Sequence, residues 1–178
     1  DLAVGAYGII NRTAFLFIMI IMGLNQGMQP IAGYNYGAKQ YDRVNSVLRL
    51  TIFLATSVVM AGFITGELFP RAVASVFTRE KELIDIVVPG MRIVFSVFPI
   101  VGFQMVTSNF FQSIGMPGKA IFMSLSRQVI FLLPFLLILP RIYGVNGVWY
   151  SMPASDFMAS MVALYLLIKQ YRKFNTGN

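Results

Sequence analysis

An apolar run, Ala14–Leu24, leads without a charged residue into a segment that carries amides and a helix-bending proline. The run is typical of a membrane-spanning helix. Hydrocarbon cannot satisfy polar groups, so amides at this depth must face protein or a water-filled cavity. We therefore expect Gln26 and Gln29 to face the interior of a helix bundle, with Pro30 allowing the helix to bend there.

The composition places the whole chain in a membrane. Of its 178 residues, 57% are hydrophobic and 12% are charged, whereas a soluble domain has about 45–50% and about 25%. The net charge is +7, but the 14 basic residues are scattered between apolar spans. This pattern argues against a nucleic-acid partner and fits the basic loops of a membrane protein.

The sequence predicts an all-α fold, a polytopic membrane helix bundle with five transmembrane helices in a lipid bilayer. A helix needs about 20 residues to cross the hydrocarbon core, and five stretches qualify. The first and third are longer than a crossing needs, which indicates tilt or bending. The second should stop at Phe69 and Pro70. The spans run approximately over residues 2–34, 44–69, 83–113, 120–139 and 145–169.

Basic residues gather in alternate loops, which fixes an expected orientation. By the positive-inside rule those loops and the C-terminus are cytoplasmic. We expect Gly33–Arg43 to form an inner turn. Five spans then put the N-terminus outside, and a chain that opens on a span suggests further helices upstream. The basic residues of these loops are Lys39, Arg43, Arg49, Lys119, Lys169, Arg172 and Lys173.

Ionisable residues at membrane depth are candidates for function. Arg127 should lie roughly 11–13 Å inside the cytoplasmic boundary and Asp156 roughly 13 Å inside it. We therefore predict an ion pair or water-bridged contact between them. It could be a structural clasp or a switchable pair in a proton or cation pathway. Arg12 and Arg92 lie in outer halves of spans, and Asp85 is two turns from Arg92 and could pair with it.

A polar stripe follows the third span. Gln104, Ser108, Asn109 and Gln112 recur at spacings of three and four residues, which brings them to one helix face. Such a stripe either holds helices together or lines a cavity. Gln26 and Gln29 form a shorter stripe on the first span.

The sequence contains no recognisable enzyme site. It has no cysteine and no histidine, which excludes disulfides, thiol chemistry and the common zinc sites. It also lacks a serine-centred nucleophile motif, paired intramembrane carboxylates and a phosphate loop. We therefore expect no enzyme activity, no cofactor and no metal centre.

Four stretches carry a family resemblance: GLNQGMQPIAGYNYGAKQYDRV, FFQSIGMPGKA, LSRQVIFLLPFLLILP and GVNGVWYSMPASD. They resemble the multidrug and toxic compound extrusion (MATE) family, in family order over nearly the whole chain. The resemblance leans to the bacterial branch and so implies a bacterial cytoplasmic (inner) membrane. It implies that residues 1–178 form part of a C-terminal lobe, helices eight to twelve of a twelve-helix exporter with two six-helix lobes.

The resemblance also implies a mechanism. Such proteins exchange H⁺ or Na⁺ for drugs or other organic compounds, often organic cations, by alternating access. The first, third and fifth spans would face the cavity of the lobe. Some members hold an ion-binding carboxylate in helix ten, but the third span has none at its middle. Coupling acids would then lie in a missing N-terminal lobe or at Asp156.

Two alternatives stay open at this stage. A lipid-linked oligosaccharide flippase of the same superfamily is favoured by Arg12, Arg92 and Arg127, because flippase cavities are rich in cationic side chains. A membrane assembly subunit without transport activity would instead have dry, interlocked polar stripes and no cavity beside the first, third and fifth spans. The candidate pathway residues are Gln26, Gln29, Arg92, Gln104, Ser108, Asn109, Arg127 and Asp156.

Overall fold

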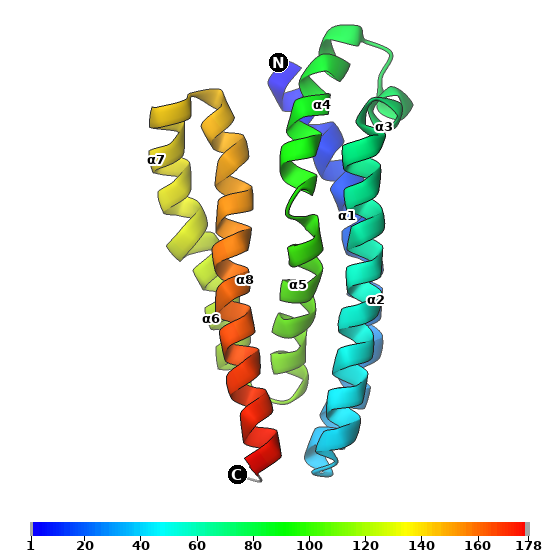
Figure 1. Cartoon of the computed structure of the whole chain (residues 1–178), viewed down its shortest axis with the longest axis vertical. Coiled ribbons are helices and arrows are strands. Elements are labelled where there is room, and N and C mark those ends of the chain that lie inside the picture. The colour runs from blue at the N-terminus through cyan, green and yellow to red at the C-terminus, as the bar shows by residue number, and fades with distance from the viewer. Residues whose placement is uncertain (1, 177–178) are drawn as a thin grey trace.

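A computed structural model describes residues 2–176, and every element within that range is a helix (Figure 1). The predicted all-α membrane bundle is thereby confirmed. The chain reverses direction at both ends of the bundle. The start of α1 and the end of α8 lie at opposite ends of the bundle (Figure 1). The elements are α1 (Leu2–Gly37), α2 (Tyr41–Leu68), α3 (Pro70–Phe77), α4 (Lys81–Phe95), α5 (Phe98–Ser113), α6 (Pro117–Leu125), the π-helix η1 (Ser126–Leu132), α7 (Leu133–Tyr143) and α8 (Val145–Thr176).

Within the described residues, up to five segments can cross a membrane. Four are long apolar helical units: α1, α2, the unit α6–η1–α7 and α8. The fifth is the pair α4 and α5, which is bent by 50°. The third span thus consists of two helices, and the bending expected of it is confirmed. The break precedes Pro99, which has no N–H to donate to the carbonyl of Phe95, the last residue of α4.

Two further boundaries differ from the prediction. The first helix continues to Gly37 and α2 begins at Tyr41, so the expected inner turn Gly33–Arg43 is mostly helical. Gly33 lies deep in a helix contact, because an added Cβ there would come within 2.9 Å of the Ser113 carbonyl oxygen. The second span does stop where expected, but Pro70 then starts the short helix α3, as proline can at a first helical position.

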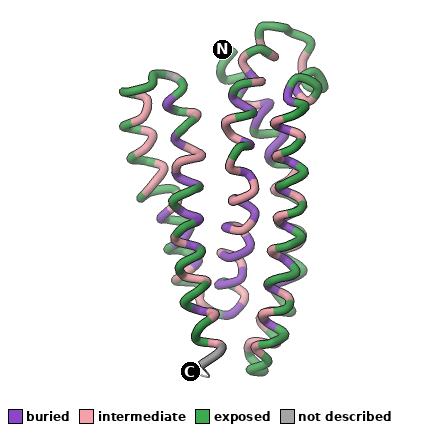
Figure 2. Tube along the Cα trace, in the orientation of Figure 1, coloured by how far each residue is buried: buried purple, intermediate pink, exposed green. Residues whose placement is uncertain are grey.

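Helix α5 lies at the centre of the bundle. It packs against α1 and α2 on one side and against α8 on the other, and Figure 2 shows buried residues concentrated along it. Close packing depends on small residues of α2 facing aromatic rings. A Cβ added to Gly66 would lie 2.6 Å from Phe95 Cγ, and one added to Gly62 would lie 2.9 Å from Phe98 Cδ1. The rings of Phe95 and Phe98 stack with centroids 4.4 Å apart.

The predicted basic loops meet at one end of the bundle. Lys119 Nζ donates a 2.6 Å hydrogen bond to Gln170 Oε1. The Phe174 ring stacks on Tyr41 with centroids 5.0 Å apart, which brings the end of α8 against the turn between α1 and α2. Many large apolar side chains point outward, and α7 has no buried residue. Such an exterior is suited to lipid tails.

Candidate functional site

A π-helical segment presents the first charged residue of the site. Pro134, at the start of α7, has no N–H for the carbonyl four residues earlier. In η1 the hydrogen bonds instead reach one residue further back, and the Leu133 N–H donates to the Gln128 carbonyl. Isolated π-helical turns in a helix are frequent at functional sites. Arg127 is the second residue of this segment.

Helix α8 presents the carboxylate. Pro153 lies inside the helix, three residues before Asp156, and allows a local kink. The helix also has an inward polar stripe whose hydroxyls donate to backbone carbonyls of the same helix. The serine hydroxyls therefore have hydrogen-bond partners within the helix although their surroundings are apolar. The buried polar residues of the stripe are Ser151, Ser155, Asp156 and Ser160.

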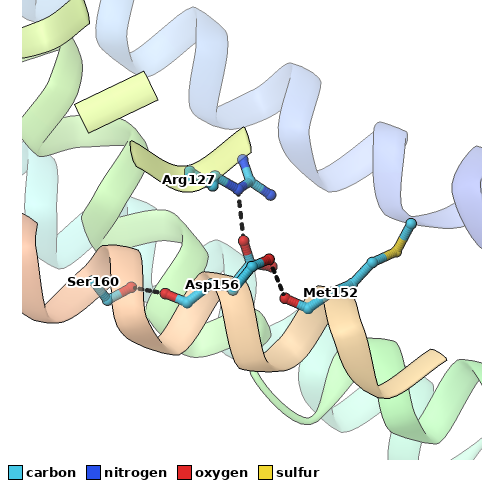
Figure 3. Close-up of polar contacts among 5 residues, drawn as sticks. Arg127, Met152, Asp156 and Ser160 are labelled. Atoms are coloured by element: carbon cyan, nitrogen blue, oxygen red, sulfur yellow. Dashed lines mark hydrogen bonds and ion pairs between the residues drawn. The ribbon is translucent and has the colours of Figure 1, made fainter. Parts of the chain in front are cut away.

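Arg127 and Asp156 form the predicted ion pair, with 2.6 Å between Arg127 Nε and Asp156 Oδ1 (Figure 3). The Asp156 side chain is 9% exposed and that of Arg127 is 40% exposed. Ser160 Oγ donates to the Asp156 backbone carbonyl at 2.7 Å. The arginine is thus the member of the pair that reaches open space, while the carboxylate is held in the protein interior.

A pocket of about 250 Å³ lies beside this pair. Its walls come from α1, α4, α5, η1 and α8, and we call it the pair pocket. Asn11 from α1 and Gln128 from η1 contribute amides, whereas Val94, Phe98 and Met152 contribute apolar surface. Asp156 is the only acidic residue in the lining of this pocket. The pair pocket can hold an ion and water next to a carboxylate.

A second pocket of about 150 Å³ lies between α5 and the α6–η1 unit, and we call it the amide pocket. Gln104, Ser108 and Asn109 line it, so these members of the predicted stripe form a cavity wall. Gln112 of the same stripe is exposed elsewhere. Arg127 and Gln128 line both pockets. The structure thus brings four of the eight candidates around the amide pocket, and Asp156 joins them through Arg127. The four are Gln104, Ser108, Asn109 and Arg127.

The amide pocket contains an unused hydrogen-bond acceptor. Gln104 is 5% exposed, and its Oε1 has no partner among the described residues. By contrast, Asn109 Nδ2 donates to the Met105 carbonyl of its own helix at 3.2 Å. Buried polar groups normally find a partner in protein or water. Gln104 therefore offers an acceptor to water or to a bound molecule.

Three candidates lie away from these pockets. Gln26 and Gln29 are exposed, so the expectation that they face the bundle interior is wrong; Asn25, one residue earlier, is the buried amide. One residue turns a helix by 100°, and a run apolar on all sides gives no signal for the correct phase. Arg92 is exposed and lines a different pocket beside α3.

The predicted contact between Asp85 and Arg92 also needs correction. Asp85 Oδ1 instead lies 2.9 Å from the Arg71 guanidinium of α3. The prediction did not include α3, the short helix that brings Arg71 back toward α4. Both side chains of the observed pair are largely exposed, at 75% and 64%.

Sequence reasoning did not select three polar residues, namely two exposed amides that line the pair pocket and one buried amide. Asn11 and Gln128 line the pair pocket, and the Asn25 amide is buried with neither polar atom partnered among the described residues. Each is an amide in or beside an apolar run, and this is the signal in the sequence that could have selected it. Within residues 2–176, no three residues of the types His, Cys, Asp or Glu come together as metal ligands.

The fold and the site define a class: a multi-pass helical membrane protein with a charged pair and two pockets that polar side chains help to line. The family model MatE matches residues 1–138, and the chain belongs to this family. Solved structures of MATE transporters have folds similar to that of this chain. One of them, the MATE multidrug transporter DinF-BH, is 41% identical, with a TM-score of 0.87 over 98% of this chain and 39% of that one.

Curated relatives agree with this assignment. The multidrug export protein MepA of Staphylococcus aureus is 23% identical over 94% of this chain and 37% of its own length. A FAD transporter of Shewanella oneidensis is 21% identical over 92% of this chain and 36% of its own length. These relatives are named as exporters and transporters and not as enzymes. The chain thus spans little more than a third of the length of the curated relatives that it matches.

Proposed function

We propose that the chain forms most of the C-terminal lobe, helices eight to twelve, of a secondary antiporter. Its activity is the export of drugs or other organic compounds, organic cations among them, coupled to the influx of H⁺ or Na⁺. The observation that carries the proposal is the Arg127–Asp156 pair at the wall of an intramembrane pocket. The likeness to a protein titled a multidrug transporter supports the same function.

The pair supplies a means of coupling. An intramembrane carboxylate can take up a proton or contact a cation, and either event weakens its attraction to Arg127. Released from Asp156, the guanidinium would turn its donors toward the amide pocket that it already lines. Gln104, Ser108 and Asn109 would then contact the transported molecule or its water. The bend between α4 and α5 and the kink at Pro153 are the positions at which the lobe could change shape during alternating access.

The remaining candidates have lesser roles in this proposal. Gln26 and Gln29, exposed on α1, would face the proposed N-terminal lobe or the passage between the lobes. Arg92 would contact solutes near the outer surface. The basic residues at the end of the bundle that holds the end of α8 support a cytoplasmic C-terminus in the bacterial inner membrane.

Neither alternative gains support. The flippase view drew weight from three arginines, but Arg12 and Arg92 do not line the pockets that Arg127 lines. An assembly subunit was expected to lack a cavity beside the first, third and fifth spans. The pair pocket occupies that position, with walls from α1, α4, α5 and α8.

Efflux from cells tests the proposal. The full open reading frame that contains this chain would be expressed in a bacterial strain without its own major exporters, and accumulation of ethidium and other fluorescent organic cations would be followed. We expect accumulation to fall on expression and to recover with a protonophore or on removal of Na⁺, whichever ion drives export. Asp156→Asn should abolish export while membrane levels persist. Asp85→Asn, which neutralises an exposed carboxylate outside the pockets, is the matched control and should keep export.

Two outcomes would contradict the proposal. The first is unchanged accumulation for a well-expressed protein with every compound of a broad drug panel and both ionic gradients. The second is full, gradient-dependent export by Asp156→Asn, which would remove the pair from the coupling pathway.

A further inference from the structure

A groove separates α2 from α8 at the end of the bundle that carries the basic loops. It has a volume of about 310 Å³. Four residues of α2 and four of α8 line it, and we call it the α2–α8 groove. It lies outside the two pockets described above and shares no lining residue with them. Its lining residues are Asn45, Leu48, Arg49 and Ile52 of α2 and Leu167, Ile168, Tyr171 and Arg172 of α8.

The wall of the groove is almost entirely apolar, and two arginines lie at one end of it. Helix α2 starts at Tyr41 and α8 runs toward Thr176, so Arg49 and Arg172 lie nearer the basic end. Ile52 and Leu167 lie deeper in the span. The Arg49 guanidinium donates to the Tyr171 hydroxyl, and its Cζ lies 5.5 Å from the centroid of that ring. These contacts hold the Arg49 guanidinium at the end of the α2–α8 groove nearer the basic loops.

The groove opens to the surroundings of the bundle. Arg49 is exposed, and the exposed fraction of Ile168 is 46%. Neighbouring faces of α2 also carry outward apolar side chains, since the exposed fractions of Leu50 and Phe53 are 56% and 68%. Apolar side chains exposed at this depth face lipid tails. An acyl chain can therefore enter the groove sideways from the membrane.

The charge at this end is strongly positive. No acidic residue lines the groove. Asp42, two turns before Arg49 on α2, is the only carboxylate side chain in the described parts of these loops and helix ends, against the seven basic residues of the loops. Asn45 adds a buried Oδ1 without a partner among the described residues, which can accept from a hydroxyl. Arginine matches phosphate oxygens well because its planar group offers two parallel donors.

We infer that the α2–α8 groove is a binding site for an anionic phospholipid of the surrounding leaflet. The phosphate would lie between Arg49 and Arg172, a glycerol hydroxyl would reach Asn45, and one acyl chain would lie along Ile52, Leu167 and Ile168. Basic pockets between membrane helices at the cytoplasmic side bind such head groups. The apolar half of the groove selects a lipid over free phosphate. This inference does not depend on the proposed transport activity.

Native mass spectrometry tests the inference on the protein from the full open reading frame. The protein would be released from nanodiscs of equal parts phosphatidylglycerol and phosphatidylethanolamine, and retained lipid would be counted. We expect phosphatidylglycerol to be retained preferentially. Arg49→Gln should lower that preference about fivefold, since a basic residue near the membrane surface contributes about one kcal/mol toward an anionic lipid. Arg49→Lys should keep most of it, and Ile52→Trp should lower retention by filling the apolar half.

Two variants separate lipid binding from general effects. Arg43→Gln removes an exposed charge at the same end but outside the groove and should leave the preference unchanged. Tyr171→Phe removes the hydroxyl that holds the Arg49 guanidinium at the groove without changing charge, so it should lower the preference, which diffuse surface charge does not predict. Equal loss in Arg43→Gln and Arg49→Gln would overturn the inference in favour of diffuse surface charge. Competition by inorganic phosphate alone, or no phosphatidylglycerol preference in the unchanged protein, would overturn it as well.

Discussion

Replacing Asp156 by alanine should destabilise the protein chiefly through the arginine left behind. The carboxylate is 9% exposed and lies 2.6 Å from Arg127 Nε. Removing one partner of a buried pair costs about 3–5 kcal/mol, because the other charge stays buried without compensation. The Arg127 side chain is 40% exposed, however, and water in the pair pocket would screen it. We therefore expect Asp156→Ala to lower the free energy of unfolding by about 2 kcal/mol.

The double variant Arg127→Met/Asp156→Leu makes the reasoning refutable. It removes both charges and replaces them with apolar groups of similar size, so we expect stability within about 1 kcal/mol of the unchanged protein. The free energy would be measured by reversible unfolding in mixed micelles of a mild detergent and dodecyl sulfate. Asp85→Ala is the control, since its exposed pair should contribute less than about 1 kcal/mol. If the double variant were as unstable as Asp156→Ala, the cost would come from packing and the electrostatic argument would fail.

Three further predictions concern stability, and the same unfolding assay checks each. Gly66→Ala should lower the free energy of unfolding by about 1–3 kcal/mol, because its Cβ would lie 2.6 Å from Phe95 Cγ. Gly27→Ala is the control and should be neutral or stabilising, because no atom lies within 4 Å of the added Cβ. Equal losses in the two variants would refute the packing argument. Gly144→Ala should cost about 1–3 kcal/mol because φ is +60° there, whereas Gly8→Ala should not. Lys119→Met should cost about 1–2 kcal/mol by leaving the buried Gln170 Oε1 without its donor, and no loss would show that water replaces the lysine.

The spans and the ion pair could be predicted because both follow from depth alone. A long apolar run fixes a crossing, and counting residues from its end fixes how deep a charge lies. Arg127 and Asp156 came out at similar depths on neighbouring spans, and the structure joins them. Membership of a known family was also readable, because its motifs occur in family order along the chain, and the family model matches residues 1–138.

The facing of individual residues could not be predicted in the same way. In a membrane bundle the outer surface is as apolar as the core, so hydrophobicity does not show which side of a helix is buried. The prediction therefore assigned Gln26 and Gln29 to the interior, where Asn25 lies. The kind of backbone irregularity depends on packing as well. Pro99 and Pro134 lie within predicted spans, but only tertiary packing decides between a break, as before α5, and a π-helical turn, as in η1.

The most direct test is to measure, by thiol labelling, whether the amide pocket is part of a pathway with alternating access to the two sides of the membrane. This chain has no cysteine, so Ser108→Cys in the pocket and Leu137→Cys on the exposed face of α7 can each be labelled with a membrane-impermeant thiol reagent. The account predicts that Ser108→Cys reacts in inverted vesicles of the full-length protein, that an imposed H⁺ or Na⁺ gradient changes its rate, and that Leu137→Cys stays unreactive in lipid. A Ser108→Cys that never reacts, or that reacts at one rate under every gradient, would contradict it.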